Sequence, residues 1–161
     1  MLCFSASLKA QTKASDVPKL VQDLNDKDPA VRGAAAAALD NLHDTAGEPA
    51  LIAGLKQSSK NVSAATVVVR TLGRFNDAKA VVAIADLLPG EAGHAAAQQL
   101  VQMDPLGIQA AADATASESE ATLAAVRDSF IDAPEVGLKV LPSTLKKKQM
   151  IWAKSWETAF S

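Results

Sequence analysis

Residues 31–42 read VRGAAAAALDNL, and this stretch indicates the fold class of the chain. It contains five consecutive alanines, and alanine has the highest intrinsic helix propensity. Its large apolar residues, Val31, Leu39 and Leu42, fall near one face of that helix with small residues between them. Small side chains let helix axes approach closely. The stretch therefore predicts a helix pressed between neighbouring helices.

Three later segments repeat the end of this helix. Residues 72–75 (LGRF) and 100–103 (LVQM) align with residues 39–42 by their last large apolar residues, and residues 130–133 (FIDA) align more loosely. The repeated large residue recurs at intervals of roughly 30 residues, which accommodates two short helices and two turns. The four aligned positions are Leu39, Leu72, Leu100 and Phe130.

A first helix is predicted before each of these second helices. The four candidates are residues 17–24, 49–55, 78–88 and 106–115, and a fifth, 135–141, precedes a longer last helix over about 144–160. No segment alternates polar and apolar residues as a half-buried strand does. The sequence thus predicts consecutive helical hairpins.

Helix start and stop signals agree with these boundaries. Asp28-Pro29 and Asp104-Pro105 each place an N-cap side chain before a proline in the first turn. Ser117 and Glu120 have the spacing of a capping box, and Pro89-Gly90 predicts that a helix ends after Leu88.

The composition fits one helical domain. The chain has 161 residues, of which 48% are hydrophobic and only 4% aromatic, with no tyrosine. The core must therefore consist of Ala, Leu, Val and Ile, which favours close helix-on-helix packing over a sheet sandwich.

Residues 24–39 (LNDKDPAVRGAAAAAL) resemble the HEAT-like repeat, which is best known from bilin lyases and many bacterial scaffolds. The shared pattern is a leucine, an acidic turn, a proline, Val-Arg, an alanine pair and Ala-Leu. The second repeat keeps only Leu72-Gly73, and the third and fourth lack the Val-Arg and the proline. The resemblance covers about residues 16–133. It implies an all-α fold, a right-handed α-α superhelix (HEAT-like solenoid) of about four to five helical hairpins.

The two ends of the chain differ from the repeats. Residues 1–15 are predicted to form an N-terminal segment, and their mildly apolar start also resembles the tail of a secretory signal without its basic residues. Residues 16–161 form the repeat domain, with a predicted C-terminal capping helix over 143–160. Trp152 and Trp156 lie four apart with Phe160, so they share one helix face. The favoured interpretation is a cover for the last hairpin, and the alternative is an anchor for a partner made by Trp152 and Trp156.

A candidate binding strip follows from the repeat alignment. In each second helix, the row two positions from the buried anchor is small or polar. In similar solenoids the second helices line the concave face, so we expect this row to form a concave strip that is basic in the middle and acidic toward the C-terminal end. The alternative is that these side chains only solvate a helix face. The strip comprises Arg70, Arg74, His94, Gln98, Gln102, Asp128 and Asp132.

Arg32 is interpreted as structural. It follows Val31 and lies near Asp26 and Asp28 in the sequence. In similar repeats, this arginine pairs with the acidic turn of its own or a neighbouring hairpin. We therefore expect Arg32 to hold the turn rather than a ligand.

The sequence favours no cofactor, metal or catalytic group. Asp40, His43 and Asp44 have a spacing that could cluster at a helix end, but three rigidly supported ligands are not evident. Neither a nucleophile elbow nor a glycine-rich phosphate loop occurs. Asn61-Val62-Ser63 matches a glycosylation acceptor, a pattern that is common by chance.

The predicted function is a non-catalytic scaffold or adaptor that binds another protein or peptide. The resemblance leaves an alternative, a bilin-lyase-like enzyme or its accessory subunit, with Arg70 and Arg74 holding tetrapyrrole propionates. Net charge is −2, which disfavours nucleic acid and a DNA-lesion enzyme. No apolar run approaches the roughly 20 residues of a membrane span. A cytoplasmic location is slightly preferred over export, and the oligomeric state stays open.

Overall fold

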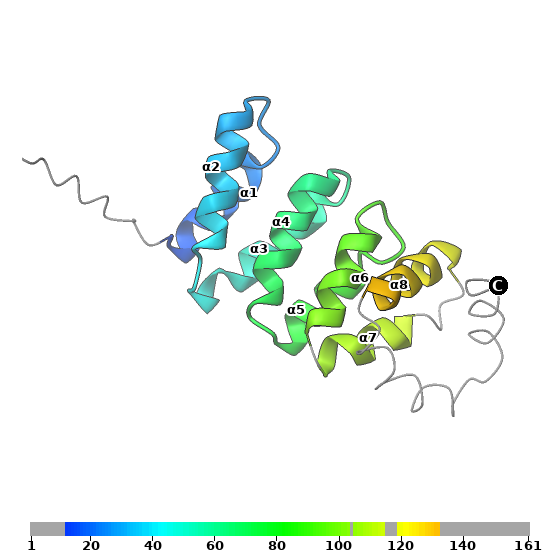
Figure 1. Cartoon of the computed structure of the whole chain (residues 1–161). Coiled ribbons are helices and arrows are strands. Elements are labelled where there is room, and N and C mark those ends of the chain that lie inside the picture. Colours follow the sequence, from blue (N-terminus) through cyan, green and yellow to red (C-terminus); the bar gives the residue numbers. More distant parts are fainter. Residues whose placement is uncertain (1–11, 104, 115–118, 133–161) are drawn as a thin grey trace, which may run out of the picture.

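The chain folds into a stack of helical hairpins (Figure 1). The computed structural model describes residues 12–103, 105–114 and 119–132, and within these ranges it contains helices and no strand. Two short 3-10 helices, η1 (Ala14–Asp16) and η2 (Thr45–Gly47), precede α1 and α3. The α-helices of the described ranges are α1 (Val17–Asp23), α2 (Pro29–Asp40), α3 (Glu48–Ser58), α4 (Val62–Gly73), α5 (Ala78–Ala85), α6 (Gly93–Gln102), α7 (Leu106–Ala114) and α8 (Glu120–Asp132).

These helices form two layers. The first helices of the hairpins, α1, α3, α5 and α7, contact one another in chain order, and so do the second helices, α2, α4, α6 and α8. Each hairpin therefore packs mainly on its sequence neighbours, which is the arrangement of a solenoid. The prediction of an all-α solenoid is confirmed, with four hairpins in the described ranges. The predicted fifth hairpin and the capping helix over 143–160 lie outside the described residues.

The predicted first helices correspond to α1, α3, α5 and α7, and two of their ends are wrong. The helix predicted over 49–55 continues to Ser58. The helix predicted over 78–88 ends at Ala85. Leu87 and Leu88 continue in tighter turns, because their amides donate to the carbonyls three residues back, those of Ile84 and Ala85, at 3.1 Å each. The turn then runs into Pro89-Gly90 as expected.

Side-chain caps explain where several helices begin. Asp28 accepts from the amide of Ala30 at 2.9 Å, with Pro29 in the first turn of α2, as predicted. Asp77 likewise caps α5, accepting from two backbone amides at 2.8 and 3.0 Å. The predicted capping residue Ser117 lies outside the described residues. At this end of α8, Ser119 Oγ accepts instead from the amide of Thr122 at 3.4 Å.

Asn61 has a structural role at the start of α4. Its side-chain oxygen accepts from the amide of Ala64 at 3.2 Å, so it is the N-cap of that helix. Its side-chain nitrogen donates to the side-chain oxygen of Asn25 at 2.9 Å, in the turn after α1. Both ends of the amide therefore make contacts within the fold.

The core runs as one apolar cluster along the seam between the layers. The four aligned anchors are buried, with relative exposures of 0% for Leu39, Leu72 and Leu100 and 2% for Phe130. Small residues let the helices approach. A Cβ atom on Gly54 of α3 would lie 2.7 Å from Val21 Cγ1 of α1, so only glycine fits there. The repeat register predicted from the sequence is therefore the register of the core.

None of the helices in the described ranges has the length and apolar character needed to cross a membrane.

Candidate functional site

The seven residues of the predicted strip lie on three adjacent second helices. Arg70 and Arg74 are on or directly after α4, and His94, Gln98 and Gln102 are on α6. Asp128 and Asp132 are on α8. All are exposed except Asp128, which is partly buried. We call these seven residues the second-helix strip. The structure places them along one layer, and their role in binding stays a prediction.

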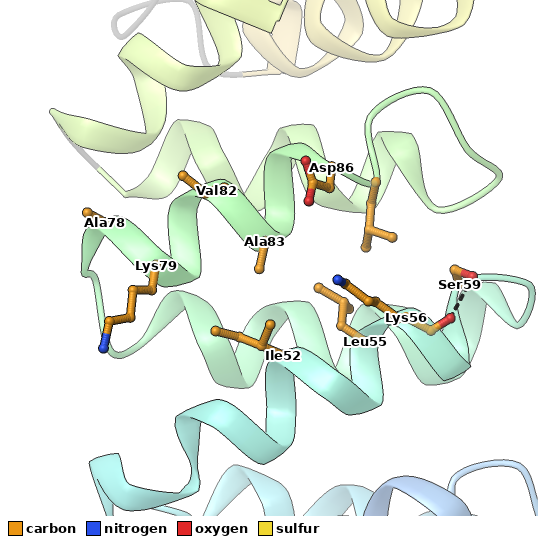
Figure 2. A pocket seen from close by; sticks show the side chains of 10 residues that line it. Ile52, Leu55, Lys56, Ser59, Ala78, Lys79, Val82, Ala83 and Asp86 are labelled. Carbon is orange, nitrogen blue, oxygen red and sulfur yellow. Dashed lines mark hydrogen bonds between the residues drawn. The ribbon is translucent and has the colours of Figure 1, made fainter.

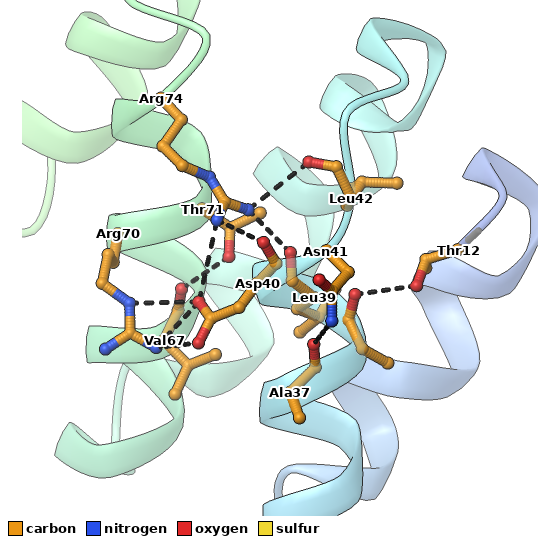
Figure 3. Close-up of polar contacts among 11 residues, drawn as sticks. Thr12, Ala37, Leu39, Asp40, Asn41, Leu42, Val67, Arg70, Thr71 and Arg74 are labelled. Atoms are coloured by element: carbon orange, nitrogen blue, oxygen red, sulfur yellow. Dashed lines mark hydrogen bonds and ion pairs between the residues drawn. The ribbon is translucent and has the colours of Figure 1, made fainter. Parts of the chain in front are cut away.

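Arg70 reaches back to the preceding second helix (Figure 3). Its Nη2 donates to both carboxylate oxygens of Asp40 on α2, at 2.7 and 2.8 Å, and its Nε donates to one of them at 3.2 Å. This fork-shaped contact suits the planar guanidinium group. The side chains of Arg70 and Asp40 remain 52% and 39% exposed, so water screens the ion pair.

Arg74 binds the carboxyl-terminal end of α2. Its Nη1 donates to the backbone oxygen of Asp40 at 2.5 Å, and its Nη2 donates to those of Leu39 at 2.7 Å and Leu42 at 3.4 Å. The last carbonyls of a helix have no partner within the helix and carry partial negative charge. Arg74 therefore caps α2 from the next repeat (Figure 3).

Asp40 is the residue of this site that sequence reasoning missed. The alignment selected the residue two positions after each buried anchor, so it excluded Asp40, which comes one position after Leu39. Arg70 and Arg74 nevertheless both contact Asp40. Its ion pair partly neutralises the expected basic middle of the strip. Asp40 was considered with His43 and Asp44 as a metal cluster; in the part of the chain that the structure describes, no three His, Cys, Asp or Glu side chains gather as a metal site.

Contacts between neighbouring second helices continue along the strip. Gln98 Nε2 of α6 donates to Asp132 Oδ2 of α8 at 3.3 Å. Between α4 and α6, the side chain of Gln99 lies against Gly73, where an added Cβ atom would overlap it. Asp128 pairs with its neighbour Arg127, with 2.9 Å between Nη2 and Oδ1. The strip is thus supported by contacts from α2 to α8.

Arg32 holds the turn of its own hairpin, as expected for a structural residue. Its Nη1 donates to the backbone oxygens of Asp26 and Lys27, both at 2.9 Å. The contact is made to carbonyls and not to the acidic side chains that the sequence suggested.

A groove lies on the opposite layer, between α3 and α5 (Figure 2). Its volume is about 770 Å³. Sequence reasoning did not find it. The available signal was the unbroken apolar run Ala80–Ala85 in α5, which buries Val81 and Ile84 but leaves Val82 61% exposed. The groove is lined by Ile52, Leu55, Lys56, Ser59, Ala78, Lys79, Val82, Ala83, Asp86 and Leu87.

One buried carboxyl group lies at the start of α3. Glu48 is 7% exposed, and its Oε1 has no hydrogen-bond partner. Burial raises the pKa of Glu48 above its ordinary value, and the negative charge of Asp77 raises it further, while Lys79 acts in the opposite direction. Asp77 is the N-cap of α5, so two carboxyl groups lie close together at the amino-terminal ends of the helices that border the groove.

Comparison with known families agrees with this architecture. A family model of HEAT repeats matches residues 17–103, which is more than half of the chain and runs from α1 to the end of α6. The chain belongs to the HEAT repeat family. The HEAT repeats of other proteins are commonly protein-interaction scaffolds and are generally non-catalytic. The α7–α8 hairpin lies beyond the matched residues and stacks on α5 and α6 in the same way.

Comparison with individual proteins adds no closer relative. No curated protein and no solved structure matches this HEAT repeat chain. The aromatic residues proposed as a C-terminal anchor, Trp152 and Trp156, lie outside the described residues.

Proposed function

We propose that this HEAT repeat protein is a non-catalytic interaction module, and that its second-helix strip contacts another protein or peptide. The supporting observation is the continuity of the strip. Exposed polar side chains from α4, α6 and α8 lie on one layer, and contacts between neighbouring second helices hold that layer together. A pre-organised surface of this kind loses little conformational entropy on binding.

The charges of the second-helix strip suggest the orientation of a bound partner. Asp40 pairs with Arg70, whereas Asp132, at the α6–α8 end of the strip, accepts a hydrogen bond from the amide of Gln98 and forms no ion pair within the described residues. We therefore expect the acidic end to attract a basic segment of the partner, with an affinity that falls as salt rises.

Reversal of Arg70 and Arg74 is a poor test of this surface. Both arginines hold α2 in place, so a lost interaction would not separate binding from folding. A better test uses Gln102→Lys with Asp132→Lys, because the Gln102 side chain forms no hydrogen bond within the described residues and Asp132 accepts one long hydrogen bond.

The matched control lies on the other layer. Gln109 and Asp113 of α7 are exposed and hydrogen-bonded to each other at 2.9 Å, so Gln109→Lys with Asp113→Lys changes the net charge equally. Tagged wild-type protein and both variants would be used for affinity capture from a lysate of the source organism. Proteins recovered with the wild type and the α7 variant but lost with the strip variant support the proposal. Equal recovery with both variants contradicts it.

A further inference from the structure

The groove between α3 and α5 points to a second interaction surface, on the layer opposite the second-helix strip. We propose that it binds an amphipathic helix of a partner protein whose contacting face carries apolar side chains between two carboxylates. The volume of about 770 Å³ falls within the range of natural binding pockets, roughly 300–1,000 Å³. Binding at this groove goes beyond the proposed function and does not depend on the second-helix strip.

The apolar part of the groove is large enough to anchor side chains. Leu55 and Leu87 are almost fully buried and close its floor, with exposures of 1% and 8%. Ile52 and Ala83 are partly buried, and Val82 stands at the rim with 61% of its surface exposed (Figure 2). Covering such exposed apolar surface is favourable by about 25 cal/mol per Å². A partner that buries Val82 therefore gains binding energy here.

Three charged side chains line the groove, and two of them are lysines. Lys56 and Lys79 both line it, and neither forms an ion pair with any residue of the described ranges. Asp86 is the one acidic residue among the lining side chains. In Figure 2, the ammonium group of Lys56 lies between the two helices, and that of Lys79 lies at the opposite end of the groove. Neither ammonium group is within ion-pair distance of a carboxylate of the described residues, so both can contact carboxylates of a partner, with Asp86 and Glu48 as the nearby acidic groups.

The positions of the lysines set the spacing that a partner needs. Lys79 is in the first turn of α5 and Lys56 is in the last turn of α3. Because α3 and α5 are the first helices of successive repeats, their starts lie at equivalent positions. The axial positions of the two lysines along the groove therefore differ by about two helical turns, or roughly 10 Å. Carboxylates at positions i and i+7 of a helix have this separation, with positions i+3 and i+4 between them facing the apolar floor. A helix lying in an apolar groove is a recurrent mode of peptide recognition.

The test uses a designed peptide and the full chain. A fluorescein-labelled helical peptide of about 16 residues would carry Glu at i and i+7 and Leu and Ile at i+3 and i+4, a length that supports an isolated helix. Fluorescence anisotropy should show saturable binding that weakens as salt rises. A matched peptide with Lys in place of both Glu should bind at least about tenfold more weakly. A peptide with Ala in place of Leu and Ile should also bind at least about tenfold more weakly.

Variants of the chain connect binding to the groove. Val82→Asp should weaken the acidic peptide at least about tenfold, whereas Val62→Asp, at a 45% exposed valine on α4, should leave it unchanged. Lys56→Glu with Lys79→Glu should reverse the preference and favour the lysine peptide. Gln102→Lys with Asp132→Lys, which alters only the strip, should have no effect. Circular dichroism would check that each variant is folded.

Several outcomes would overturn the proposal. The first is no anisotropy change at protein concentrations up to about 1 mM, the weak limit of specific binding. The second is equal binding of all peptides, which would indicate an unspecific apolar surface. The third is a dimer in sedimentation velocity that Val82→Asp disrupts, because a second copy would then occupy the groove.

Discussion

Two seams between successive repeats solve the same packing problem differently. On the second-helix layer, the seam between α2 and α4 is bridged by Arg70 and Arg74, which bind a carboxylate and three carbonyls of α2 and the turn after it. On the first-helix layer, the seam between α3 and α5 is bordered by Lys56 and Lys79 and stays open as a groove. Both seams lie between helices of successive repeats, but the cationic side chains that border them differ.

The chemistry of the cations explains which seam is bridged. A guanidinium group is planar and presents five donors, so one arginine can bind several oxygens at a helix end. An ammonium group is a compact, strongly hydrated charge on a flexible stem and bridges less well. At the α2–α4 seam two arginines bind oxygens of the neighbouring helix, whereas the lysines at the α3–α5 seam form no ion pair with any residue of the described ranges.

The largest expected effect compares the cores beneath the two seams. Leu39 is completely buried under the bridged seam, so Leu39→Ala should lower the free energy of unfolding by about 2–5 kcal/mol. Ile52 is only partly buried in the wall of the groove, so Ile52→Ala should cost about 1 kcal/mol. Urea denaturation of both variants measures the difference. Equal losses would show that the groove wall supports the fold as strongly as the core under the bridged seam.

The next effect tests the arginine cap itself. Arg74→Ala removes three hydrogen bonds to the carbonyls at the end of α2 and should cost about 1–3 kcal/mol. Lys79→Ala, at the open seam, should change stability by less than about 0.5 kcal/mol. Thermal melts of the two variants provide the comparison. If Arg74→Ala melts together with Lys79→Ala, the cap does not stabilise α2.

Much of this architecture could be predicted from the sequence, because the signals are local and repeated. The recurrence of Leu39, Leu72, Leu100 and Phe130 placed four residues that are all buried. Asp28-Pro29 marked the start of α2 correctly, because N-caps depend on the next few residues alone. The end of α5 was placed three residues too far, since the change to tighter hydrogen bonds has no comparably strong sequence signal.

The candidate sites were less accessible, because they depend on contacts between residues far apart in the chain. The pairing of Asp40 with Arg70 joins residues in different repeats, and nothing in either helix alone indicates it. The groove depends on how far α3 and α5 separate, which is set by packing. An alignment of second helices could therefore find the strip, but not its cap on α2 or the groove on the other layer.

A smaller effect concerns the amino-terminal ends of the helices that border the open seam. The folded-state pKa of Glu48 is raised, so at neutral pH the charged form destabilises the fold, and this penalty disappears as the pH falls below the ordinary value of 4.5. Glu48→Gln removes the buried negative charge and its repulsion from Asp77, so it should raise stability at pH 7. The two proteins should converge below about pH 4. Melting temperatures across this range test the assignment, and parallel pH profiles would contradict it.

The smallest expected effect concerns the ion pair of Arg70 and Asp40. Its strength decides whether Arg70 can contact a partner. The ion pair of Arg70 and Asp40 is exposed, so a double-mutant cycle with Arg70→Ala and Asp40→Ala should give a coupling of about 0.2–1 kcal/mol that falls with salt. The contacts of Arg74 with backbone oxygens survive in Asp40→Ala, so the cycle isolates the side-chain pair. A weak coupling leaves the Arg70 guanidinium available to a carboxylate of a partner. A coupling well above this range would mean that Arg70, like Arg74, serves the fold first, and the binding strip would then reduce to its α6 and α8 residues.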